Sequence, residues 1–160
     1  MKILLIDDDR IFHVLMTEVL KSEGYELFLA GDPVEGIELF DNVLPDLVLL
    51  DVHMPGMNGC EVAPILKKKA AEYGKFIPII FFTSSNDEHE LVRCIDSGGD
   101  DLINKPFNEN LLEVKLRAWQ RNIKLINENK MPKPAGLSDF GNSHLSKEEL
   151  FDLLLPPEEE

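Results

Sequence analysis

The sequence predicts an α/β protein, with a doubly wound, five-stranded parallel sheet that carries helices on both faces. Short apolar runs bounded by turn residues alternate with segments whose apolar residues recur at the i, i+3, i+4 spacing of an amphipathic helix. This alternation gives five βα units. Right-handed crossovers between parallel strands then place the connecting helices on both faces of one sheet.

Each element is bounded by local signals. Asp32 caps a helix that Pro33 opens, and Asn108 caps the last helix. Gly24 ends the first helix, because glycine tolerates the left-handed backbone found after helix C-termini. The expected strands are residues 2–6, 26–30, 47–51, 77–83 and 101–104. The expected helices are residues 10–22, 33–40, 59–73, 87–97 and 109–127. The first helix is expected to bury Ile11, Val14, Leu15, Val19 and Leu20.

The composition changes after residue 128. Residues 1–128 contain all five βα units, whereas residues 130–136 have too little apolar content to fold alone and are typical of a linker. A capping-box pattern beginning at Ser146 precedes a short apolar stretch. We therefore expect residues 129–160 to form a linker and one short amphipathic helix.

The chain is acidic and has no obvious targeting segment. Its formal net charge of −14 argues against direct binding to nucleic acid or to an anionic membrane, since both require a basic face. No apolar run approaches the roughly 18 residues of a membrane span. Cys60 and Cys94 form no C-x-x-C motif, and the N-terminus shows no signal-peptide pattern, so a reducing cytoplasm is the expected location. Neither cysteine receives a role from the sequence.

Reactive side chains follow four of the predicted strands at their carboxyl ends. They are Asp7 and Asp8 after the first strand, Asp51 after the third, Thr83 after the fourth and Lys105 after the fifth. Ligands of open parallel sheets bind at this edge, so these side chains are expected to share a site. Converging carboxylates repel one another, and a hard divalent cation such as Mg²⁺ relieves the repulsion. The sequence therefore predicts a metal-assisted phosphoryl site.

Individual residues of this set have more ordinary explanations. A single Asp after a strand is usually a turn or helix-cap residue, and Ser84 or Ser85 could supply the hydroxyl in place of Thr83. The convergence of so many reactive residues on one edge favours a shared site. The histidines lack zinc-ligand spacing and are expected to be solvated or to lie on helix surfaces. They are His13, His53, His89 and His144.

The motifs at these strand ends occur in a familiar order. They are Asp7-Asp8, Asp51 followed by Met54-Pro55-Gly56-Met57-Asn58-Gly59, then Thr83, then Lys105-Pro106. Over about residues 1–125 the chain resembles the receiver domain of two-component response regulators. The resemblance implies that Asp51 is the phosphoacceptor, Thr83 the switch hydroxyl and Lys105 the phosphate partner, with a cis peptide before Pro106. The implied Mg²⁺ ligands are Asp7, Asp8, Asp51 and the backbone carbonyl oxygen of His53.

The resemblance implies a signalling switch whose only catalysis is its own phosphorylation and slow dephosphorylation. A histidine kinase or histidine phosphotransfer protein would donate the phosphoryl group to Asp51. The fourth helix, fifth strand and fifth helix would then change their contacts with a partner protein. Two alternatives stay open: a Mg²⁺-dependent phosphohydrolase with Asp7 or Asp51 as nucleophile, and a binding module that works without phosphorylation.

Three features depart from the family pattern. Leu102 stands where most receivers place an aromatic residue that follows the switch hydroxyl. The spacing from Asp51 to Thr83 is long for the family, so the loop between the third helix and the fourth strand is expected to carry an insertion. The fifth helix carries a heptad seam that extends past its usual end, which predicts a homodimer or cover by residues 150–155. The seam consists of Leu112, Leu116, Trp119, Ile123 and Ile126.

Overall fold

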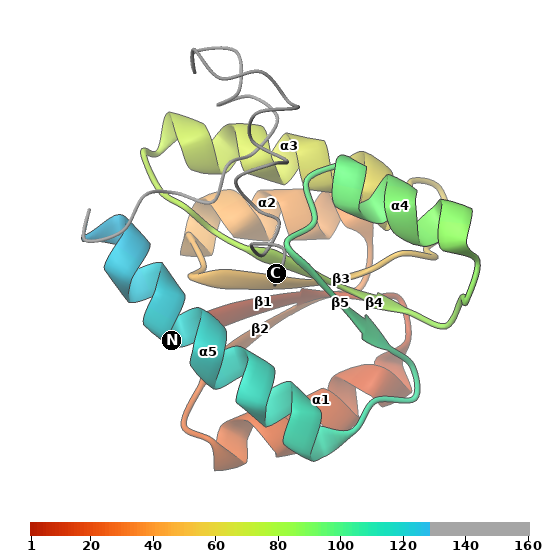
Figure 1. Cartoon of the computed structure of the whole chain (residues 1–160), viewed down its shortest axis with the longest axis horizontal. Helices are drawn as coiled ribbons and strands as arrows, with labels where there is room; N and C mark the ends of the chain where they lie inside the picture. Colours follow the sequence, from red (N-terminus) through yellow and green to blue (C-terminus); the bar gives the residue numbers. More distant parts are fainter. Residues whose placement is uncertain (129–160) are drawn as a thin grey trace, which may run out of the picture.

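A single parallel sheet forms the centre of the molecule, as Figure 1 shows. We describe a computed structural model, in which residues 1–128 of the chain are placed. The predicted linker and C-terminal helix, residues 129–160, lie outside the described residues. The strands are β1 (Lys2–Ile6), β2 (Glu26–Ala30), β3 (Leu47–Asp51), β4 (Ile79–Thr83) and β5 (Asp101–Asn104). The helices are α1 (Arg10–Ser22), α2 (Pro33–Val43), α3 (Gly59–Glu72), α4 (Glu88–Asp96) and α5 (Glu109–Asn127).

The predicted fold class is confirmed, and element bounds differ from the expected ones by a few residues. The helix expected at residues 33–40 continues to Val43, because the Leu44 N–H caps it with a hydrogen bond of 2.9 Å to Phe40 from a left-handed backbone. The strand expected from residue 77 begins at Ile79, since Pro78 has no N–H to contribute to the sheet.

Strand order β2-β1-β3-β4-β5 brings the reactive strand ends together. β3 lies between β1 and β4, with Leu50 opposite Ile6. Asp51 lies opposite Phe82 on β4, and Thr83 lies opposite Asn104 on β5. In this register the residues that follow β1 and β5 reach the same edge as the last residues of β3 and β4.

Helices cover both faces of the sheet, which explains why β3 and β4 are buried along their whole length. α1 and α5 lie on one face, and α2, α3 and α4 lie on the other (Figure 1). Phe12 and Leu112 are in the apolar core on the first face, and Phe40, Val62 and Cys94 are in the core on the second. No helix in the described part combines the length and hydrophobicity that crossing a bilayer requires.

The buried face of α1 differs from the predicted one. Ile11, Val14 and Leu15 are 81%, 64% and 41% exposed. Two sets of residues on α1 have helical spacing, and the aromatic Phe12 decides between them, because its ring packs edge-on against Phe82 with centroids 5.1 Å apart. The result is an exposed apolar patch on the first two turns of α1. The side chains that α1 buries are Phe12, Met16, Val19 and Leu20.

Two residues of the predicted heptad seam, in the C-terminal half of α5, are buried. Ile123 and Ile126 are only 7% and 2% exposed. The homodimer stays a prediction, and residues 150–155, the alternative cover, lie outside the described residues. Asn127 anchors the helix end to the connection between α3 and β4. Its Oδ1 accepts from the Phe76 N–H at 3.0 Å, and its Nδ2 donates to the Phe76 carbonyl at 3.3 Å.

Candidate functional site

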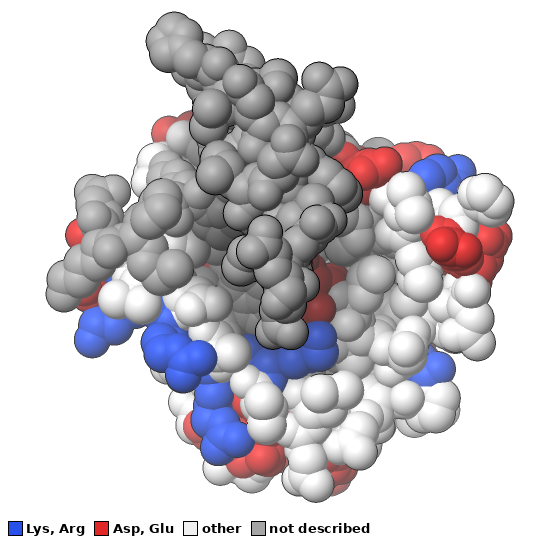
Figure 2. Space-filling model, in the orientation of Figure 1, with Lys and Arg blue, Asp and Glu red and all other residues white. Residues whose placement is uncertain are grey.

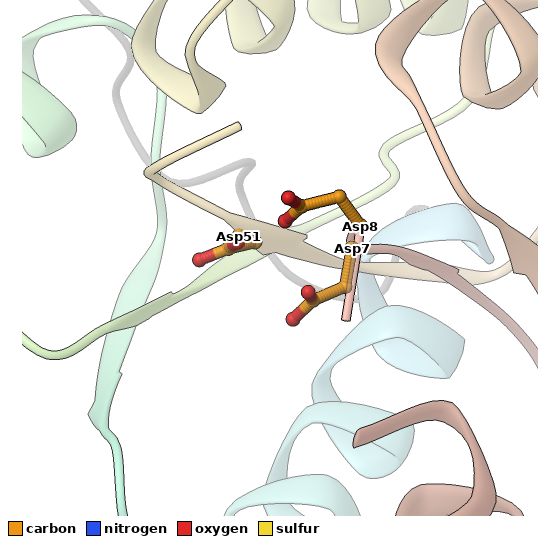
Figure 3. A group of neighbouring side chains, drawn as sticks. All are labelled: Asp7, Asp8 and Asp51. Atoms are coloured by element: carbon orange, nitrogen blue, oxygen red, sulfur yellow. The ribbon is translucent and has the colours of Figure 1, made fainter. Parts of the chain in front are cut away.

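Three carboxylates meet at the carboxyl edge of the sheet. Asp7 and Asp8 follow β1, Asp51 ends β3, and Figure 3 shows their side chains beside one another. One carboxylate oxygen from each lies within 4.8 Å of the others. Asp7 and Asp51 are buried, whereas Asp8 is exposed to solvent. Among residues 1–128 this is the only cluster of acidic, His or Cys side chains whose spacing could hold a metal ion.

Asp7 is held in place by partners at both carboxylate oxygens. The backbone N–H of Asp9 donates to Oδ1 at 2.9 Å, and Lys105 Nζ donates to Oδ2 at 2.6 Å. The Asp7 side chain is fully buried. It is therefore a fixed negative charge that orients the lysine.

Lys105 places an ammonium between the acids. Its Nζ lies 3.6 Å from Asp51 Oδ1 in addition to its contact with Asp7. The ammonium also lies 4.2 Å from the centre of the Phe12 ring, a favourable cation–π arrangement. The Lys105 N–H donates to the Thr83 carbonyl at 2.8 Å, and the peptide to Pro106 is cis, as the resemblance implied. These contacts direct the ammonium at Asp51.

Thr83 ends β4 and is fully buried. Its Oγ1 accepts the backbone N–H of Ser85 at 3.0 Å. Ser85 Oγ in turn accepts the N–H of Asp87, the residue that caps α4. The Thr83 hydroxyl is thus connected through Ser85 to the start of α4.

The surroundings of Asp51 disfavour the ionised form of its carboxyl group. Burial, and then the negative charge of Asp7, raise the pKa of Asp51 from 3.8 to about 6. Asp8 raises it further, while Lys105 and a hydrogen bond from the backbone of His53 oppose the rise. An ionised Asp51 is therefore costly in the protein alone, and an added positive charge at the cluster would relieve that cost.

The donor set fits Mg²⁺, a hard cation that takes oxygen ligands in octahedral geometry and keeps several waters. The acidic oxygens are spread over distances up to 4.8 Å, somewhat wider than one octahedral shell. Asp8 and Asp51 fit as direct ligands, and Asp7, which Lys105 already holds, fits through water. The role of the His53 carbonyl stays a prediction.

Stability of the metal-free protein should depend on the charge of Asp51. The folded-state pKa of about 6 lies above the ordinary 3.8, so Asp51 binds its proton more tightly in the folded state. Its contribution to the free energy of unfolding is then fully present below pH 3.8 and is lost as the pH rises through about 6. We expect a loss of about 2 kcal/mol, since water at the open site screens part of the effect.

Urea unfolding in chelator at several pH values between 4 and 7 measures this contribution, with Asp51→Asn as the reference that lacks the titrating group. The variant should be the more stable protein at pH 7, and the difference should vanish at pH 4. Equal pH dependence of the two proteins would show that ionisation of Asp51 does not lower the free energy of unfolding.

The loop after Asp51 ends at Gly59, where the backbone returns close to the carbonyl oxygens of Asp51 and Val52. The Gly59 N–H donates to the Val52 carbonyl at 2.8 Å, and Asn58 caps α3 through the Glu61 N–H. A Cβ added at Gly59 would overlap the backbone carbonyl oxygen of Asp51. Only glycine allows α3 to begin this close to the phosphoacceptor candidate.

Gly59→Ala should therefore destabilise the protein by about 2 kcal/mol or more, because neither backbone segment can retreat cheaply. Gly31→Ala is the matched control, since the nearest atom to its added Cβ is 3.7 Å away. Thermal or urea unfolding of both variants tests the packing. Equal stability of the two would mean that the loop is free to move.

Two histidine contacts at the site were not predicted from the sequence. His13 Nε2 lies 2.6 Å from the Asp7 carbonyl oxygen, a contact beyond the expected solvated or helix-surface position. His53 Nε2 lies 2.6 Å from Glu90 Oε1, which links the residue two positions after Asp51 to α4. The position of His13, one turn after Asp9 on α1, was the only available signal, and nothing in the sequence pairs His53 with Glu90.

The chain matches a known family over most of the described residues. The family model described as the response regulator receiver domain matches residues 3–117. The DNA-binding response regulator MtrA of Mycolicibacterium paratuberculosis is 38% identical over 120 residues, which are 75% of this chain and 51% of that protein. The transcriptional regulatory protein CpxR of Escherichia coli K12 is 37% identical over 120 residues, 75% of this chain and 49% of that protein. The chain thus spans about half the length of these relatives.

Solved structures show the same fold. The chemotaxis protein CheY4 of Vibrio cholerae is 26% identical, with a TM-score of 0.68, over 73% of this chain and 96% of that one. A two-component response regulator from Clostridium difficile is 27% identical, with a TM-score of 0.70, over 75% of this chain and 95% of that one.

Proposed function

This chain belongs to the response regulator receiver domain family, and from that premise we propose that its phosphoacceptor is Asp51. Response regulators of two-component systems interact with histidine kinases, and phosphorylation on Asp is typical of the family. One observation supports Asp51 above Asp7. It is a strand-end carboxylate that faces a lysine ammonium at 3.6 Å, whereas Asp7 is already bound through both oxygens.

The proposed reaction is an in-line displacement at phosphorus. A carboxylate oxygen of Asp51 attacks the phosphoryl group of a phosphohistidine, the P–N bond breaks, and the imidazole leaves with the bonding electron pair. Mg²⁺ held by the acidic cluster would neutralise charge on the phosphoryl oxygens. Lys105 Nζ, oriented by Asp7, supplies a second positive charge on the side of Asp51 Oδ1. Phosphorylation and slow dephosphorylation are then the only catalysis this chain performs.

The same geometry suggests how the new phosphate changes the surface. A phosphoryl group on Asp51 attracts the Thr83 hydroxyl, and Thr83 is bonded to the loop that caps α4. Movement of Thr83 therefore displaces that loop and α4. Large apolar side chains are exposed on α4 and α5, where a partner protein could read the change. They are Val92, Ile95, Leu111 and Val114.

We place the docking site for the phosphodonor on α1. Arg10 begins α1 directly after the acidic residues, and Ile11 and Val14 on its first two turns are exposed apolar side chains. Ile11→Asp should lower phosphotransfer from a histidine phosphotransfer protein by about tenfold or more, through loss of apolar contact. Labelling by the small donor acetyl phosphate should be unchanged.

The matched control is Val34→Asp, which adds the same charge at an exposed apolar position on α2, on the opposite face of the sheet. Time courses of phosphotransfer from the phosphorylated donor to each variant, quenched at intervals, measure the two rates. If Val34→Asp slowed transfer as much as Ile11→Asp, α1 would not be the docking site.

The expectation that this chain does not bind nucleic acid directly stays a proposal. The relative MtrA is named a DNA-binding regulator, and it is about twice as long as the matched region. Figure 2 shows that basic side chains gather along the α5 side of the described residues, despite the net charge of −14. On α5, Lys115 is already paired with Asp101 at 2.8 Å. We propose protein-mediated output, which a DNA-binding assay of the full chain tests.

The function is tested by incubating the full chain with acetyl phosphate and Mg²⁺. Intact-mass spectrometry should show the gain of one phosphoryl group, and excess chelator should prevent the gain. Turnover of p-nitrophenyl phosphate should stay at background, whereas sustained turnover would favour the phosphohydrolase alternative. No gain of mass with either acetyl phosphate or a phosphorylated histidine donor would contradict the proposed function.

A further inference from the structure

The chain has two cysteines, and the fold brings them together. Cys60 is the second residue of α3, and Cys94 lies on α4, 34 positions later. Their Sγ atoms are 3.0 Å apart. A disulfide bond is about 2.05 Å long, so the sulfur atoms need to approach by roughly 1 Å. Two side-chain rotations at a helix–helix contact can supply a displacement of that size.

We propose that Cys60 and Cys94 are a modification site at which mild oxidation forms an intramolecular disulfide that ties α4 to α3. The inference goes beyond the phosphoryl chemistry of Asp51 and rests on separate residues. Disulfides in reducing compartments are usually transient and redox-sensing, which fits a bond that reductant can reverse.

The two sulfurs differ in access. Cys94 is fully buried in the core between the sheet and the helices, whereas Cys60 is only half-buried, in the first turn of α3. Burial, and then the hydrogen bond with Cys60, raise the pKa of Cys94 to about 12, so its thiol stays protonated at neutral pH. A dissolved oxidant therefore meets Cys60 first, and Cys94 acts as the resolving thiol.

The chemistry balances with hydrogen peroxide as the oxidant. The Cys60 sulfur attacks one peroxide oxygen, the O–O bond breaks, and the products are Cys60 sulfenic acid and water. The Cys94 sulfur then attacks the Cys60 sulfur, the S–O bond breaks, and the departing hydroxide takes the Cys94 proton as a second water. Two electrons pass from the sulfur pair to the peroxide.

The bond would connect α4, the helix proposed to move, with the start of α3, which packs against Asp51. Glu90, one turn before Cys94 on α4, is the residue that contacts His53. Gly59, the neighbour of Cys60, packs on the backbone of Asp51. A covalent link between these two points restrains α4 against α3, so the oxidised protein should hold α4 in a single position.

The test treats the full chain with one equivalent of hydrogen peroxide, then adds N-ethylmaleimide under denaturing conditions. The product should have lost the mass of two hydrogen atoms and taken up no maleimide, and dithiothreitol should restore two reactive thiols. Cys94→Ala should lose this product and instead accumulate sulfenic or sulfinic acid at Cys60. Cys60→Ser should keep one thiol that peroxide does not oxidise.

Hydrogen exchange of the oxidised and reduced chains measures how far the disulfide restrains α4. The α4 amides should exchange more slowly after oxidation, and dithiothreitol should reverse the change. Three results would overturn the proposal. They are a wild-type chain that reaches Cys60 sulfinic acid with Cys94 still labelled, a disulfide that joins two chains, and a disulfide that leaves α4 exchange unchanged.

Discussion

Asp51→Asn is expected to abolish phosphoryl uptake from acetyl phosphate and from a phosphorylated histidine donor. The amide keeps the size of the side chain but lacks the anionic oxygen that attacks phosphorus, so labelling should fall at least about a hundredfold. Asp7 cannot take over efficiently, because both of its carboxylate oxygens are held. Time-resolved intact-mass spectrometry of the two proteins measures the effect.

Asp96→Asn is the matched control for this substitution. Asp96 is an exposed carboxylate at the end of α4, so its replacement removes the same charge without touching the site. The control should be labelled at the wild-type rate. Wild-type labelling of Asp51→Asn would mean that another residue accepts the phosphoryl group.

Lys105→Ala has the second largest expected effect, and it should separate two roles at the site. Loss of the ammonium removes a positive charge from the transferring phosphoryl group, and phosphorylation should slow by about tenfold to a hundredfold. The fully buried Asp7 also loses its partner, which should destabilise the protein by about 3 kcal/mol. Lys115→Ala is the control, since the Lys115–Asp101 pair is more exposed and should contribute about 1 kcal/mol or less.

Mg²⁺ binding distinguishes the lysine from the acids. Lys105→Ala should still bind Mg²⁺, because none of the acidic oxygens is removed. Asp8→Ala should lose Mg²⁺ binding together with phosphorylation, since it removes the exposed carboxylate of the cluster. Titration calorimetry on folded samples of both variants gives the comparison. If Lys105→Ala lost the metal as completely as Asp8→Ala, the division of roles would be wrong.

The fold and the position of the site could be predicted from the sequence because strand ends are strongly marked. Each buried strand is a short apolar run, and polar residues such as Asp51 and Thr83 end it abruptly. Parallel topology then puts successive carboxyl ends on one edge, so adjacency in space follows from position along the strand. The roles assigned to the individual residues remain proposals.

Side-chain packing was harder to predict, because one helix can offer two apolar faces. On α1, Ile11 and Phe12 start two sets with the same helical spacing, and only the neighbouring ring of Phe82 selects Phe12. On α5, the sequence predicts a seam that needs cover but cannot show what covers Ile126, which is 2% exposed. These choices depend on contacts between residues far apart in the chain.

The contact between Cys60 and Cys94 could not be predicted for a similar reason. The two residues have no motif spacing, and their approach depends on how α4 packs against α3. The contact of His53 with Glu90 depends on the same packing. Each pair joins a residue that follows Asp51 in the chain to a residue of α4, so the least predictable contacts are those that connect the site to α4.

Borohydride trapping of the phosphorylated chain tests the identity of the phosphoacceptor most directly. Borohydride reduces an aspartyl phosphate to homoserine, and peptide mass spectrometry then locates the converted residue. The chain treated with acetyl phosphate and Mg²⁺ should contain homoserine at position 51 and at no other aspartate. Homoserine in place of Asp7 or Asp8, with position 51 unchanged, would contradict the assignment of Asp51 as the phosphoacceptor.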